Sequence, residues 1–542
     1  MKNNKNLRKW LDNFNLSHPL IIAGPCSAET ENQVIEIADQ LKDSDATVYR
    51  AGIWKPRTRP GNFEGVGSLA LDWLKRVKKE TNILTTTEVA NANHVDLALK
   101  NDIDILWIGA RTTVSPFIVQ EIADALNGTD KIVLIKNPVN PDLSLWLGAI
   151  ERIYTSNIKN IGAIHRGFST YEKTKYRNNP EWQIAIDLQR KLPDLPLILD
   201  PSHIAGRRDL IFDLCQTALD LNYDGLMIET HNDPDNAWSD AKQQITPSVL
   251  KEISKKLVVR RKSNDNDDFK IKLGTLRAQI NMHDEQLINI LGNRMKVAKK
   301  IGSLKKENNV AVLQSGRWNE ILERMIKVGS SEGLSEELIL KVFKAIHRGF
   351  STYEKTKYRN NPEWQIAIDL QRKLPDLPLI LDPSHIAGRR DLIFDLCQTA
   401  LDLNYDGLMI ETHNDPDNAW SDAKQQITPS VLKEITKKLI VRRKSNDDDD
   451  FKTNLETLRA QINMHDEQLI NVLGNRMKVA KKIGSLKKEN NVAVLQSGRW
   501  NEILERMIKD GKSEGLSEEL ILKVFKAIHQ ESINNQNQIL KK

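Results

Sequence analysis

The stretch Leu197-Ile198-Leu199-Asp200-Pro201-Ser202-His203 predicts how the first part of the chain folds. Three apolar residues typical of a buried strand end abruptly in polar residues, among them a carboxylate and an imidazole. Seven further apolar runs of this kind occur within residues 1–262. In chain order the eight runs are Leu20–Ala23, Thr47–Ile53, Ile83–Thr87, Ile105–Ile108, Ile132–Ile135, Ile161–Ile164, Leu197–Leu199 and Leu226–Ile228.

Helical patterns separate these runs, as in Gln33–Leu41, Leu69–Lys79 and Asp209–Leu221. Eight strand–helix units in about 260 residues predict an α/β fold, a (β/α)8 TIM barrel. Enzymes with this fold do their chemistry at the carboxyl ends of the strands. The polar residues that follow each run therefore form the candidate site.

Four of these residues have the chemistry of metal ligands. Cys26, His203, Glu229 and Asp240 follow the first, seventh and eighth runs, and they offer one sulfur, one nitrogen and two carboxylate oxygens. A structural zinc site would use paired Cys or His at short spacing, whereas a mixed soft and hard set suits a catalytic divalent ion such as Mn, Fe or Co. A lone buried Cys is usually core packing, but the shared position of the four favours a metal site.

Positive charges gather at the same strand ends. Most Lys and Arg residues form solvated surface pairs. Their repetition at strand ends instead predicts a site for a small, highly anionic substrate such as a phosphorylated carboxylate. The cations are Arg50, Lys55, Arg111, Lys136 and Arg166.

Five motifs together resemble the short type I-beta class of 3-deoxy-D-arabino-heptulosonate-7-phosphate (DAHP) synthase. The family condenses phosphoenolpyruvate with erythrose 4-phosphate in the shikimate pathway of aromatic amino-acid biosynthesis. A sibling enzyme in this fold uses arabinose 5-phosphate, and the Lys-Pro-Arg-Thr run argues against that acceptor. The resemblance covers essentially all of residues 1–260. The motifs are Gly24-Pro25-Cys26-Ser27, Lys55-Pro56-Arg57-Thr58, Gly109-Ala110-Arg111, Asp200-Pro201-Ser202-His203 and Ile228-Glu229-Thr230-His231.

The resemblance implies roles for individual residues. Arg57 and Thr58 would bind the aldose phosphate, and the four candidate ligands would hold the metal. Lys55 and Lys136 are the candidate catalytic residues, and Glu88 is a further substrate-binding candidate. The residues implied to bind phosphoenolpyruvate are Arg50, Lys55, Gly109, Ala110, Arg111, Lys136 and Arg166.

Composition excludes several classes of protein. Hydrophobic residues at 39% exclude a disordered chain, and the three cysteines are too few for a disulfide scaffold. Apolar runs fall short of the ~20 residues of a membrane helix, and Pro19–Gly24 is too short for a secretory signal. The net charge of +6, with mixed signs, does not indicate nucleic-acid binding. We expect a cytoplasmic enzyme that acts on small-molecule substrates and does not bind membranes. We also expect no N-terminal regulatory domain before the first strand.

A long duplication organises the rest of the chain. Residues 165–346 recur as residues 347–528 with nine differences and no gap. We interpret this as an internal tandem duplication of a parent with one barrel and one helical module. The alternative is a sequence-assembly artefact, and the intact mass of the native polypeptide decides between them.

Charged linkers near residues 260–265 and 442–447 divide the chain further. The predicted domains are a barrel at 1–262, a truncated helical module at 267–346, an incomplete barrel copy at 347–444 and a complete helical module at 450–542.

The incomplete copy cannot repeat the whole barrel site. It keeps Arg348, His385, Glu411 and Asp422 but has no counterpart of Cys26, which excludes a complete second metal site. Two parallel strands cannot bury both faces alone. The copy is therefore expected to pack poorly or to compete for closing the barrel, and shorter loop closure favours the first copy.

Each helical module begins with one long helix. In the first module, apolar spacing predicts helices at 273–307, 315–328 and 335–346. So long a helix cannot bury its length against two short ones, so the modules should pair, within the chain or in a homo-oligomer. Arg294 and Lys305 share a helix face, whereas Arg277 lies about 100° away and is predicted to serve another pocket.

This pattern resembles the all-helical type II chorismate mutase, a domain-intertwined dimer that rearranges chorismate to prephenate. By resemblance, Arg459 would reach the partner module's site, while Lys487 and Gln536 would stabilise charge growing on the ether oxygen. The implied catalytic residues are Arg476, Lys487, Arg499 and Gln536. The implied substrate-binding residues are Arg277, Arg294, Lys305, Arg317, Arg459, Gln496 and Ser532.

The helical modules depart from that family in two ways. A Gln and a Trp, which cannot accept a hydrogen bond from the substrate hydroxyl, stand where the family often has Asp and Glu. These residues are Gln314 and Trp318 in the first module and Gln496 and Trp500 in the second. The first module also has Phe350 and Glu354 in place of Ser532 and Gln536. A Glu beside growing negative charge repels it, so the first module's pocket is predicted to be impaired.

We interpret the chain as a bifunctional enzyme, a DAHP synthase joined to chorismate mutase. The alternative is that the helical modules are chiefly a regulatory unit. They would then bind chorismate or prephenate as effectors of the barrel, with little mutase catalysis.

Overall fold

The computed structural model describes residues 5–14, 16, 18–55, 61, 63–170, 174–261, 263–310, 315–348, 358–360, 362, 364–374, 376–443 and 446–541. These residues separate into two compact units. The first contains residues 1–270, 484–501 and 537–542, and the second contains residues 271–483 and 502–536.

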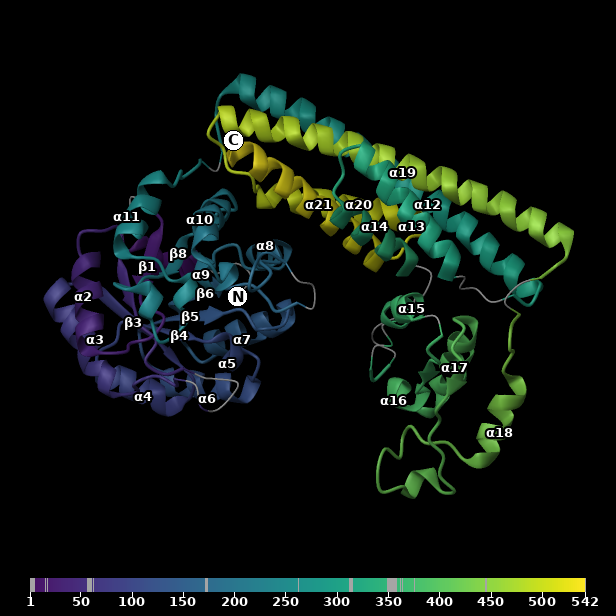
Figure 1. Ribbon diagram of the computed structural model, residues 1–542, viewed down its shortest axis with the longest axis horizontal. Coiled ribbons are helices and arrows are strands. Elements are labelled where there is room, and N and C mark those ends of the chain that lie inside the picture. The colour runs from purple at the N-terminus through teal and green to yellow at the C-terminus, as the bar shows by residue number, and fades with distance from the viewer. Residues whose placement is uncertain are drawn as a thin grey trace. The chain divides into compact units, whose positions relative to one another are not determined.

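Eight parallel strands close a barrel in the first unit (Figure 1). They follow one another in chain order, and β8 pairs with β1 so that Gly24 lies opposite Glu229. Each of the eight predicted runs coincides with or overlaps one strand, so the predicted (β/α)8 fold is confirmed. The strands are β1 (Leu20–Gly24), β2 (Val48–Arg50), β3 (Leu84–Val89), β4 (Ile105–Ile108), β5 (Ile132–Lys136), β6 (Ile161–His165), β7 (Leu197–Leu199) and β8 (Gly225–Glu229).

Helices alternate with the strands, and polar side chains begin several of them. Thr30 accepts a hydrogen bond from the Gln33 backbone at the start of α2, and Asp200 accepts one from His203 at the start of α9. The region predicted as one helix at Asp209–Leu221 is a 3-10 turn followed by α10. The helices are α2 (Glu31–Leu41), α3 (Leu69–Thr81), α4 (Ala92–Lys100), α5 (Ala110–Thr113), α6 (Pro116–Leu126), α7 (Leu143–Thr155), α8 (Trp182–Lys191), α9 (Pro201–Ala205), α10 (Ile211–Asp220) and α11 (Pro247–Lys256).

A short N-terminal helix, α1 (Lys9–Asp12), closes the amino end of the barrel. Its Trp10 is buried and donates from Nε1 to the Ile161 carbonyl at 2.8 Å. Trp10 packs with strand residues such as Leu20, Ile22 and Trp107 in one apolar cluster. The polar ends of the strands therefore face the opposite, carboxyl mouth.

The helical modules each contain one helix of 41 residues and two shorter ones. The first long helix starts at Asp267, earlier than the predicted residue 273, because Asn266 caps it by accepting a hydrogen bond from Phe269 at 3.0 Å. Figure 1 shows α12 and α19 side by side. The elements are α12 (Asp267–Glu307), α13 (Ser315–Ser331) and α14 (Glu336–Arg348), then α19 (Asp449–Glu489), α20 (Ser497–Ser513) and α21 (Glu518–Lys541).

Buried ion pairs join α12 to α19. Arg294 Nε lies 2.6 Å from Asp466 Oδ1, and Arg476 Nε lies 2.6 Å from Asp284 Oδ1. The later residue of one helix thus meets the earlier residue of the other, which makes the two helices antiparallel. An apolar cluster that includes Val297, Ala298 and Ile462 packs along the same seam.

The strands of the incomplete barrel copy form a sheet of their own. Its two strands pair with each other, Gly407 opposite Ile380, while the first copy closes the barrel, as predicted. Ile380 is 61% exposed, whereas its counterpart in the barrel, Ile198, is fully buried. The elements are α15 (Trp364–Lys373), β9 (Ile380–Leu381), α16 (Pro383–Ala387), α17 (Ile393–Asp402), β10 (Gly407–Leu408) and α18 (Pro429–Lys438).

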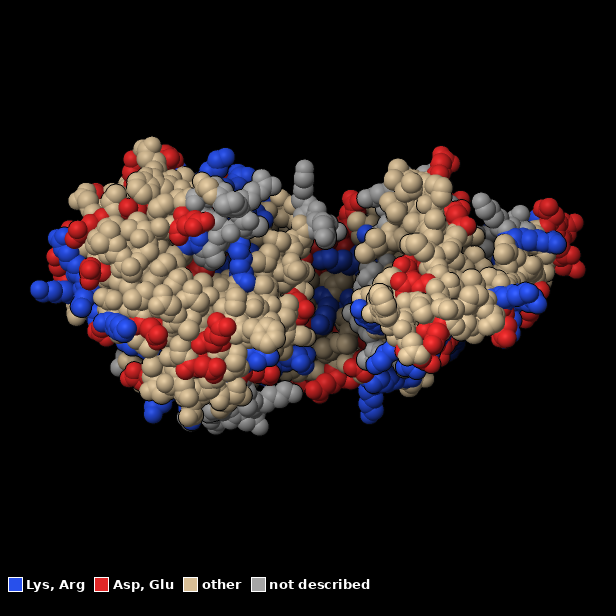
Figure 2. All heavy atoms as spheres, turned by 90° about the horizontal axis from the view of Figure 1, so that it is seen from below, with Lys and Arg blue, Asp and Glu red and all other residues tan. Residues whose placement is uncertain are grey.

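Acidic and basic side chains are interspersed on the face shown in Figure 2. This matches the near-balance of 79 Lys and Arg against 73 Asp and Glu in the sequence. Among the described helices, none combines the length and the apolar composition needed to cross a bilayer.

Candidate active site

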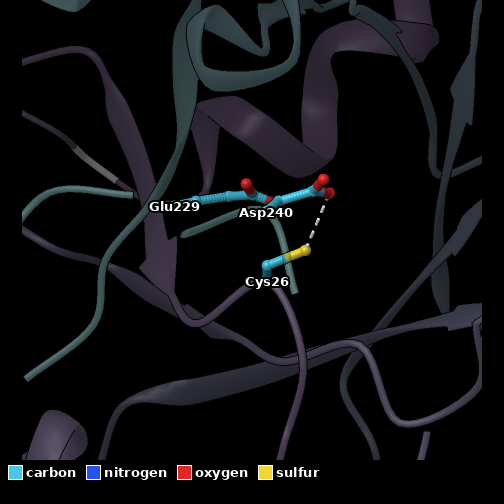
Figure 3. Close-up of side chains that lie close together, drawn as sticks. All are labelled: Cys26, Glu229 and Asp240. Carbon is cyan, nitrogen blue, oxygen red and sulfur yellow. Dashed lines mark hydrogen bonds between the residues drawn. The ribbon is translucent and has the colours of Figure 1, made fainter. Parts of the chain in front are cut away.

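Cys26, Glu229 and Asp240 lie together at the carboxyl mouth of the barrel (Figure 3). Their ligand atoms are all within 4.8 Å of one another, and Cys26 Sγ is 3.3 Å from Asp240 Oδ2. Cys26 follows β1 and Glu229 ends β8, so pairing of these two strands brings the thiol to the carboxylate. Asp240 comes from the loop after β8, where its φ of 50° is in the left-handed region.

His203, the fourth predicted ligand, stands beside this cluster on α9. Its Nε2 is 4.0 Å from Asp240 Oδ2, and its Nδ1 is 3.0 Å from Asp200 Oδ1. A carboxylate that holds one ring nitrogen of a histidine orients the other nitrogen for a metal. His203 therefore neighbours Glu229 and Asp240, but it is not among the three residues whose ligand atoms all lie within 4.8 Å of one another.

Neighbouring polar side chains donate hydrogen bonds to the two carboxylates of the cluster. Gln243 donates to Glu229 Oε2 at 2.6 Å, and Arg177 donates to Asp240 Oδ1 at 2.8 Å. Glu229 Oε1 is buried and accepts no hydrogen bond from the described residues, although Arg50 lies 3.2 Å away. A sulfur, an imidazole and two supported carboxylates are a donor set that fits a divalent transition metal. Sequence reasoning missed Arg177 and Gln243, because Arg177 lies in a loop and Gln243 in a short 3-10 helix, both outside the strand-end motifs.

The electrostatics of the cluster separate the thiol from the acids. Burial, reinforced by the Glu229 charge, raises the pKa of Cys26 to about 12. Burial also opposes ionisation of Asp240, yet the charges of His203 and Arg177 hold its pKa below the ordinary value. The carboxylate is therefore charged at neutral pH while the thiol keeps its proton, which a bound metal would displace.

Two of the predicted cations lie beside the cluster. Lys55 Nζ is 3.0 Å from Cys26 Sγ and donates to the Cys26 carbonyl at 2.6 Å. Arg50 is buried with its guanidinium 5.1 Å from the centre of the Trp107 ring. Lys136 lies 5.6 Å from the same ring and 2.8 Å from Asp200 Oδ2. The Trp107 ring therefore makes cation–π contacts with both Arg50 and Lys136.

Arg166 and Arg111, the remaining predicted cations, add positive charge at the barrel mouth. Arg166 donates to Asn178 Oδ1 at 2.9 Å, and burial, aided by the charges of Arg177 and Arg111, lowers the pKa of Arg166 to about 10. Arg166 remains charged at neutral pH, and the positive charges of Arg166, Arg177 and Arg111 together would stabilise a bound anion. Arg111 is exposed.

Gly109 and Glu88 fit closely together next to these cations. A Cβ at Gly109 would lie 2.0 Å from Glu88 Oε1, so a side chain there would displace Glu88. Glu88 in turn accepts a hydrogen bond from Trp107 Nε1 at 3.0 Å. Ala110 begins α5 directly after Gly109. Arg57 and Thr58, predicted to bind the aldose phosphate, lie outside the described residues.

In the second helical module, the structure brings Arg476 and Ser532 together. Arg476 Nη1 donates to Ser532 Oγ at 2.8 Å, and both side chains are buried. Gln536, one helical turn further along α21, is also buried. Of the first module's predicted residues, Gln314, Phe350 and Glu354 lie outside the described part of the chain. The side chain of Arg348, predicted for the incomplete barrel copy, also lies outside it.

Other predicted residues of this module lie at the end of α19, in the loop that follows it and at the start of α20. Lys487 is buried at the end of α19, and its Nζ donates to the Val494 carbonyl at 2.5 Å. Gln496 and Arg499 follow and are partly buried. In the first module Arg317 donates to Asn463 Oδ1 at 2.7 Å. Arg277 is partly buried on α12.

Asp284 and Asp466 are buried site residues that sequence reasoning missed. Each pairs with an arginine predicted for the site of the other module. Asp284 pairs with Arg476, a predicted catalytic residue, and Asp466 pairs with Arg294, a predicted substrate-binding residue. The signal was available, since Asp284 interrupts the apolar stripe of Ile280, Leu287 and Leu291. An acid in such a stripe indicates a buried cationic partner.

Asp284→Ala is expected to destabilise the helical modules by about 3–5 kcal/mol, because it leaves the buried charge of Arg476 uncompensated. The midpoint of urea unfolding, followed by far-UV circular dichroism, measures the change. Ala at the adjacent exposed Glu285 is the control and should leave the midpoint unchanged. Equal midpoints in the two variants would contradict this assignment.

Lys305 lies close to a cation from the other module. Burial, with the nearby charge of Arg459, lowers the pKa of Lys305 to about 8. Below that pH the amine is charged and attracts an anion, and the charge is lost as the pH rises through the pKa. Arg459 itself pairs with Glu456, a residue replaced by Gly274 in the first module.

The titration of Lys305 can be observed in the full chain by NMR of lysine labelled with carbon-13 at Cε, assigned with Lys305→Arg. We expect a midpoint near pH 8 that rises in Arg459→Gln. Arg277→Gln is the matched control and should leave the midpoint in place. A midpoint unaffected by Arg459→Gln would contradict the proximity of the two cations.

Two family models match the chain. The DAHP synthetase I family matches residues 16–263, and chorismate mutase type II matches residues 276–355 and 458–537. The second match therefore occurs once in each copy of the duplication.

Individual relatives match the barrel part of the chain. The phospho-2-dehydro-3-deoxyheptonate aldolase of Thermotoga maritima is 34% identical over 233 residues, which are 43% of this chain and 67% of that protein. The 2-dehydro-3-deoxyphosphooctonate aldolase of Brucella ovis is 27% identical over 268 residues, covering 45% of this chain and 92% of that protein. The crystal structure of DAHP synthase from Thermotoga maritima aligns with a TM-score of 0.41 and 32% identity over 44% of this chain and 68% of that one. The chain thus belongs to the DAHP synthetase I family and carries two chorismate mutase type II domains behind its barrel.

Proposed function

We propose that the barrel condenses phosphoenolpyruvate with erythrose 4-phosphate and that the helical modules rearrange chorismate to prephenate. The observation that carries the first half is the juxtaposition of a thiol, an imidazole and two carboxylates with buried cations at one mouth of a closed barrel. Such a mouth suits a substrate with both a phosphate and a carboxylate.

Different cations of the barrel mouth would contact different parts of the substrates. Lys136 and Arg166, with Arg111 at the rim, would hold the phosphate and carboxylate of phosphoenolpyruvate. Lys55 and Arg50 would face the reacting carbons beside Cys26. A new carbon–carbon bond would form between the methylene carbon of phosphoenolpyruvate and the aldehyde carbon. Water would give its hydroxyl to the carbon that bears the phosphate and its proton to the former aldehyde oxygen. The bond from that carbon to the phosphate oxygen would then break and release inorganic phosphate. Fixed cations would stabilise the charge that develops during this step.

A divalent metal would be held by Cys26, His203, Glu229 and Asp240. When bound, it would polarise the aldehyde oxygen of the aldose as a Lewis acid. Asp200, Gln243 and Arg177 would orient the ligands. The donor set favours Mn, Fe or Co over a structural zinc.

Phosphate release from phosphoenolpyruvate tests the proposed condensation. The purified full chain, loaded with Mn(II), is expected to release phosphate with erythrose 4-phosphate and at least about tenfold more slowly with arabinose 5-phosphate, a preference of about 1.4 kcal/mol. A preference for arabinose 5-phosphate would overturn the assignment of the acceptor. No release with either sugar would overturn the condensation itself.

For the second activity, we propose that the two helical modules pair within one chain. The reciprocal Arg–Asp pairs and the shared apolar cluster support this arrangement. The family resemblance implies that chorismate is bound in the second module by Arg476, Lys487, Arg499, Ser532 and Gln536, with the cations holding its carboxylates. Catalysis there would rest on orientation and charge stabilisation without a covalent step.

We further propose domain boundaries near residues 262, 346 and 444, where the barrel, the first module, the incomplete copy and the second module meet. A cytoplasmic location is supported by the cysteines, since Cys26, Cys215 and Cys397 are free and buried.

A regulatory role for the helical modules is the second candidate, and one observation in the first unit favours it. The Val494 and Leu495 amides donate to the Asp220 carbonyl at 3.0 and 3.2 Å, and Asn222 Nδ2 donates to the Leu495 carbonyl at 2.8 Å. The loop that leads to Gln496 is thus fastened to the end of α10 in the barrel. Ligand binding at this loop would bias the barrel through these bonds.

Asn222→Ala should weaken inhibition of the synthase by prephenate about fivefold, because one hydrogen bond contributes about 1 kcal/mol. The measurement is the prephenate concentration that halves the synthase rate. Asn404, the counterpart of Asn222 in the incomplete copy, provides the control variant Asn404→Ala. An unchanged inhibition in Asn222→Ala would argue against this route.

A further inference from the structure

The incomplete barrel copy has a cluster of potential metal ligands of its own. His385, Glu411 and Asp422 offer ligand atoms that all lie within 4.8 Å of one another. They come from α16, from the segment after β10 and from the loop before α18. We propose that these three residues form a second divalent-metal site, independent of the barrel site and of its reaction.

The histidine is oriented for this role. Its Nδ1 lies 2.8 Å from Asp382 Oδ2, and its Nε2 lies 3.4 Å from Glu411 Oε1 and 3.9 Å from Asp422 Oδ2. A carboxylate on one ring nitrogen fixes the tautomer that leaves the other nitrogen free to coordinate. Nε2 therefore lies toward the two acids.

In each of the two carboxylates, one oxygen accepts a hydrogen bond from a neighbouring side chain and the other oxygen lies near His385. Gln425 donates to Glu411 Oε2 at 2.8 Å, so Oε1 is the atom near His385. Arg359 donates to Asp422 Oδ1 at 2.9 Å, so Oδ2 is the atom near His385. This division of oxygens distinguishes the cluster from a group of solvated surface acids.

The site would differ from the barrel site in chemistry. The fragment's one cysteine, Cys397, is buried in its apolar core on α17, so no thiolate joins the set. The side chains of His385, Glu411 and Asp422 are 47%, 30% and 34% exposed, which lets water complete the coordination. One nitrogen and two carboxylate oxygens suit a borderline or hard ion such as Mn(II) or Co(II).

Metal binding would stabilise this fragment. The three ligands lie on three separate segments, and the described residues of this copy form a sheet of two strands. An ion that bridges them would link segments that otherwise share a small core, and its binding energy would add to folding stability.

Co(II) binding to the full chain tests the proposal. In a chain whose barrel site is disabled by Cys26→Ala and Asp240→Ala, equilibrium dialysis and metal analysis should find about one Co(II) per chain. Its near-ultraviolet spectrum should lack the sulfur-to-cobalt charge-transfer band of a thiolate ligand. Adding His385→Ala should remove this ion, whereas adding His413→Ala, a nearby histidine outside the cluster, should retain it.

Two further variants guard against misfolding. His385→Gln and Glu411→Gln should also lose the ion while keeping the far-UV circular dichroism of the parent. The proposal is overturned if the barrel-disabled chain binds no Co(II) at up to about 1 mM, the weak end of divalent-ion sites. It is equally overturned if the folded His385→Gln chain binds as much as its parent.

Discussion

Replacing Cys26 by Ala is expected to lower the synthase rate by about a thousandfold or more and to leave the mutase rate unchanged. The variant removes the one sulfur ligand, and Lewis-acid polarisation of the aldehyde contributes several kcal/mol, at about 1.4 kcal/mol per tenfold. Phosphate release and prephenate formation, measured on the same preparation with its metal content, separate the two activities.

Cys397→Ala is the control for this experiment, because that buried thiol belongs to the apolar core of the incomplete copy. It should keep both activities. Full synthase activity in the Cys26→Ala chain would contradict the metal assignment, and so would an equal loss in the Cys397→Ala chain.

The second large effect is expected at Lys487. Lys487→Ala should reduce mutase turnover by about 10²–10³-fold, because a buried cation that stabilises developing charge is usually worth that much. The duplication supplies the matched control, since Lys305 stands at the same position of the first module. Lys305→Ala should cost less than about threefold, a small fraction of the loss expected at Lys487.

The reason for this asymmetry lies in the tails of the modules. In the second module Ser532 contacts Arg476 at 2.8 Å, whereas the first module has Phe350 at the position of Ser532 and Glu354 at that of Gln536. Turnover measured with chorismate would contradict this account if Lys305→Ala removed as much activity as Lys487→Ala.

The same variants separate catalysis from regulation. If the modules were chiefly an effector site, the unmutated chain would show no measurable mutase turnover while prephenate still inhibited the synthase. In a catalytic module, Lys487→Ala loses turnover. Prephenate inhibition of the synthase, measured beside it, shows whether the same pocket also acts on the barrel.

Much of the barrel could be predicted from local sequence. Apolar runs such as Ile105–Ile108 and Leu197–Leu199 match β4 and β7 residue for residue. Because parallel strands in a barrel all end at one mouth, placing Cys26, His203 and Glu229 at strand ends was enough to place them near one another. The (β/α)8 class and the candidate ligands therefore followed from short stretches of sequence.

Contacts between segments that are distant in the sequence could not be predicted from local patterns. The support of Asp240 by Arg177 depends on loop conformation, which no periodicity encodes. The pairing of Asp284 with Arg476 depends on how two long helices align. The incomplete copy illustrates the same limit, because the absence of a thiol was visible in the sequence while the convergence of His385 with two supported acids was not.

A crystal structure of the full chain grown with Mn(II) and phosphoenolpyruvate tests the account most directly. The account predicts an anomalous peak within bonding distance of Cys26 Sγ and of the His203, Glu229 and Asp240 side chains. It also predicts phosphoenolpyruvate bound by Lys136 and Arg166. Manganese bound away from all four side chains, or phosphoenolpyruvate bound outside the barrel mouth, would contradict it.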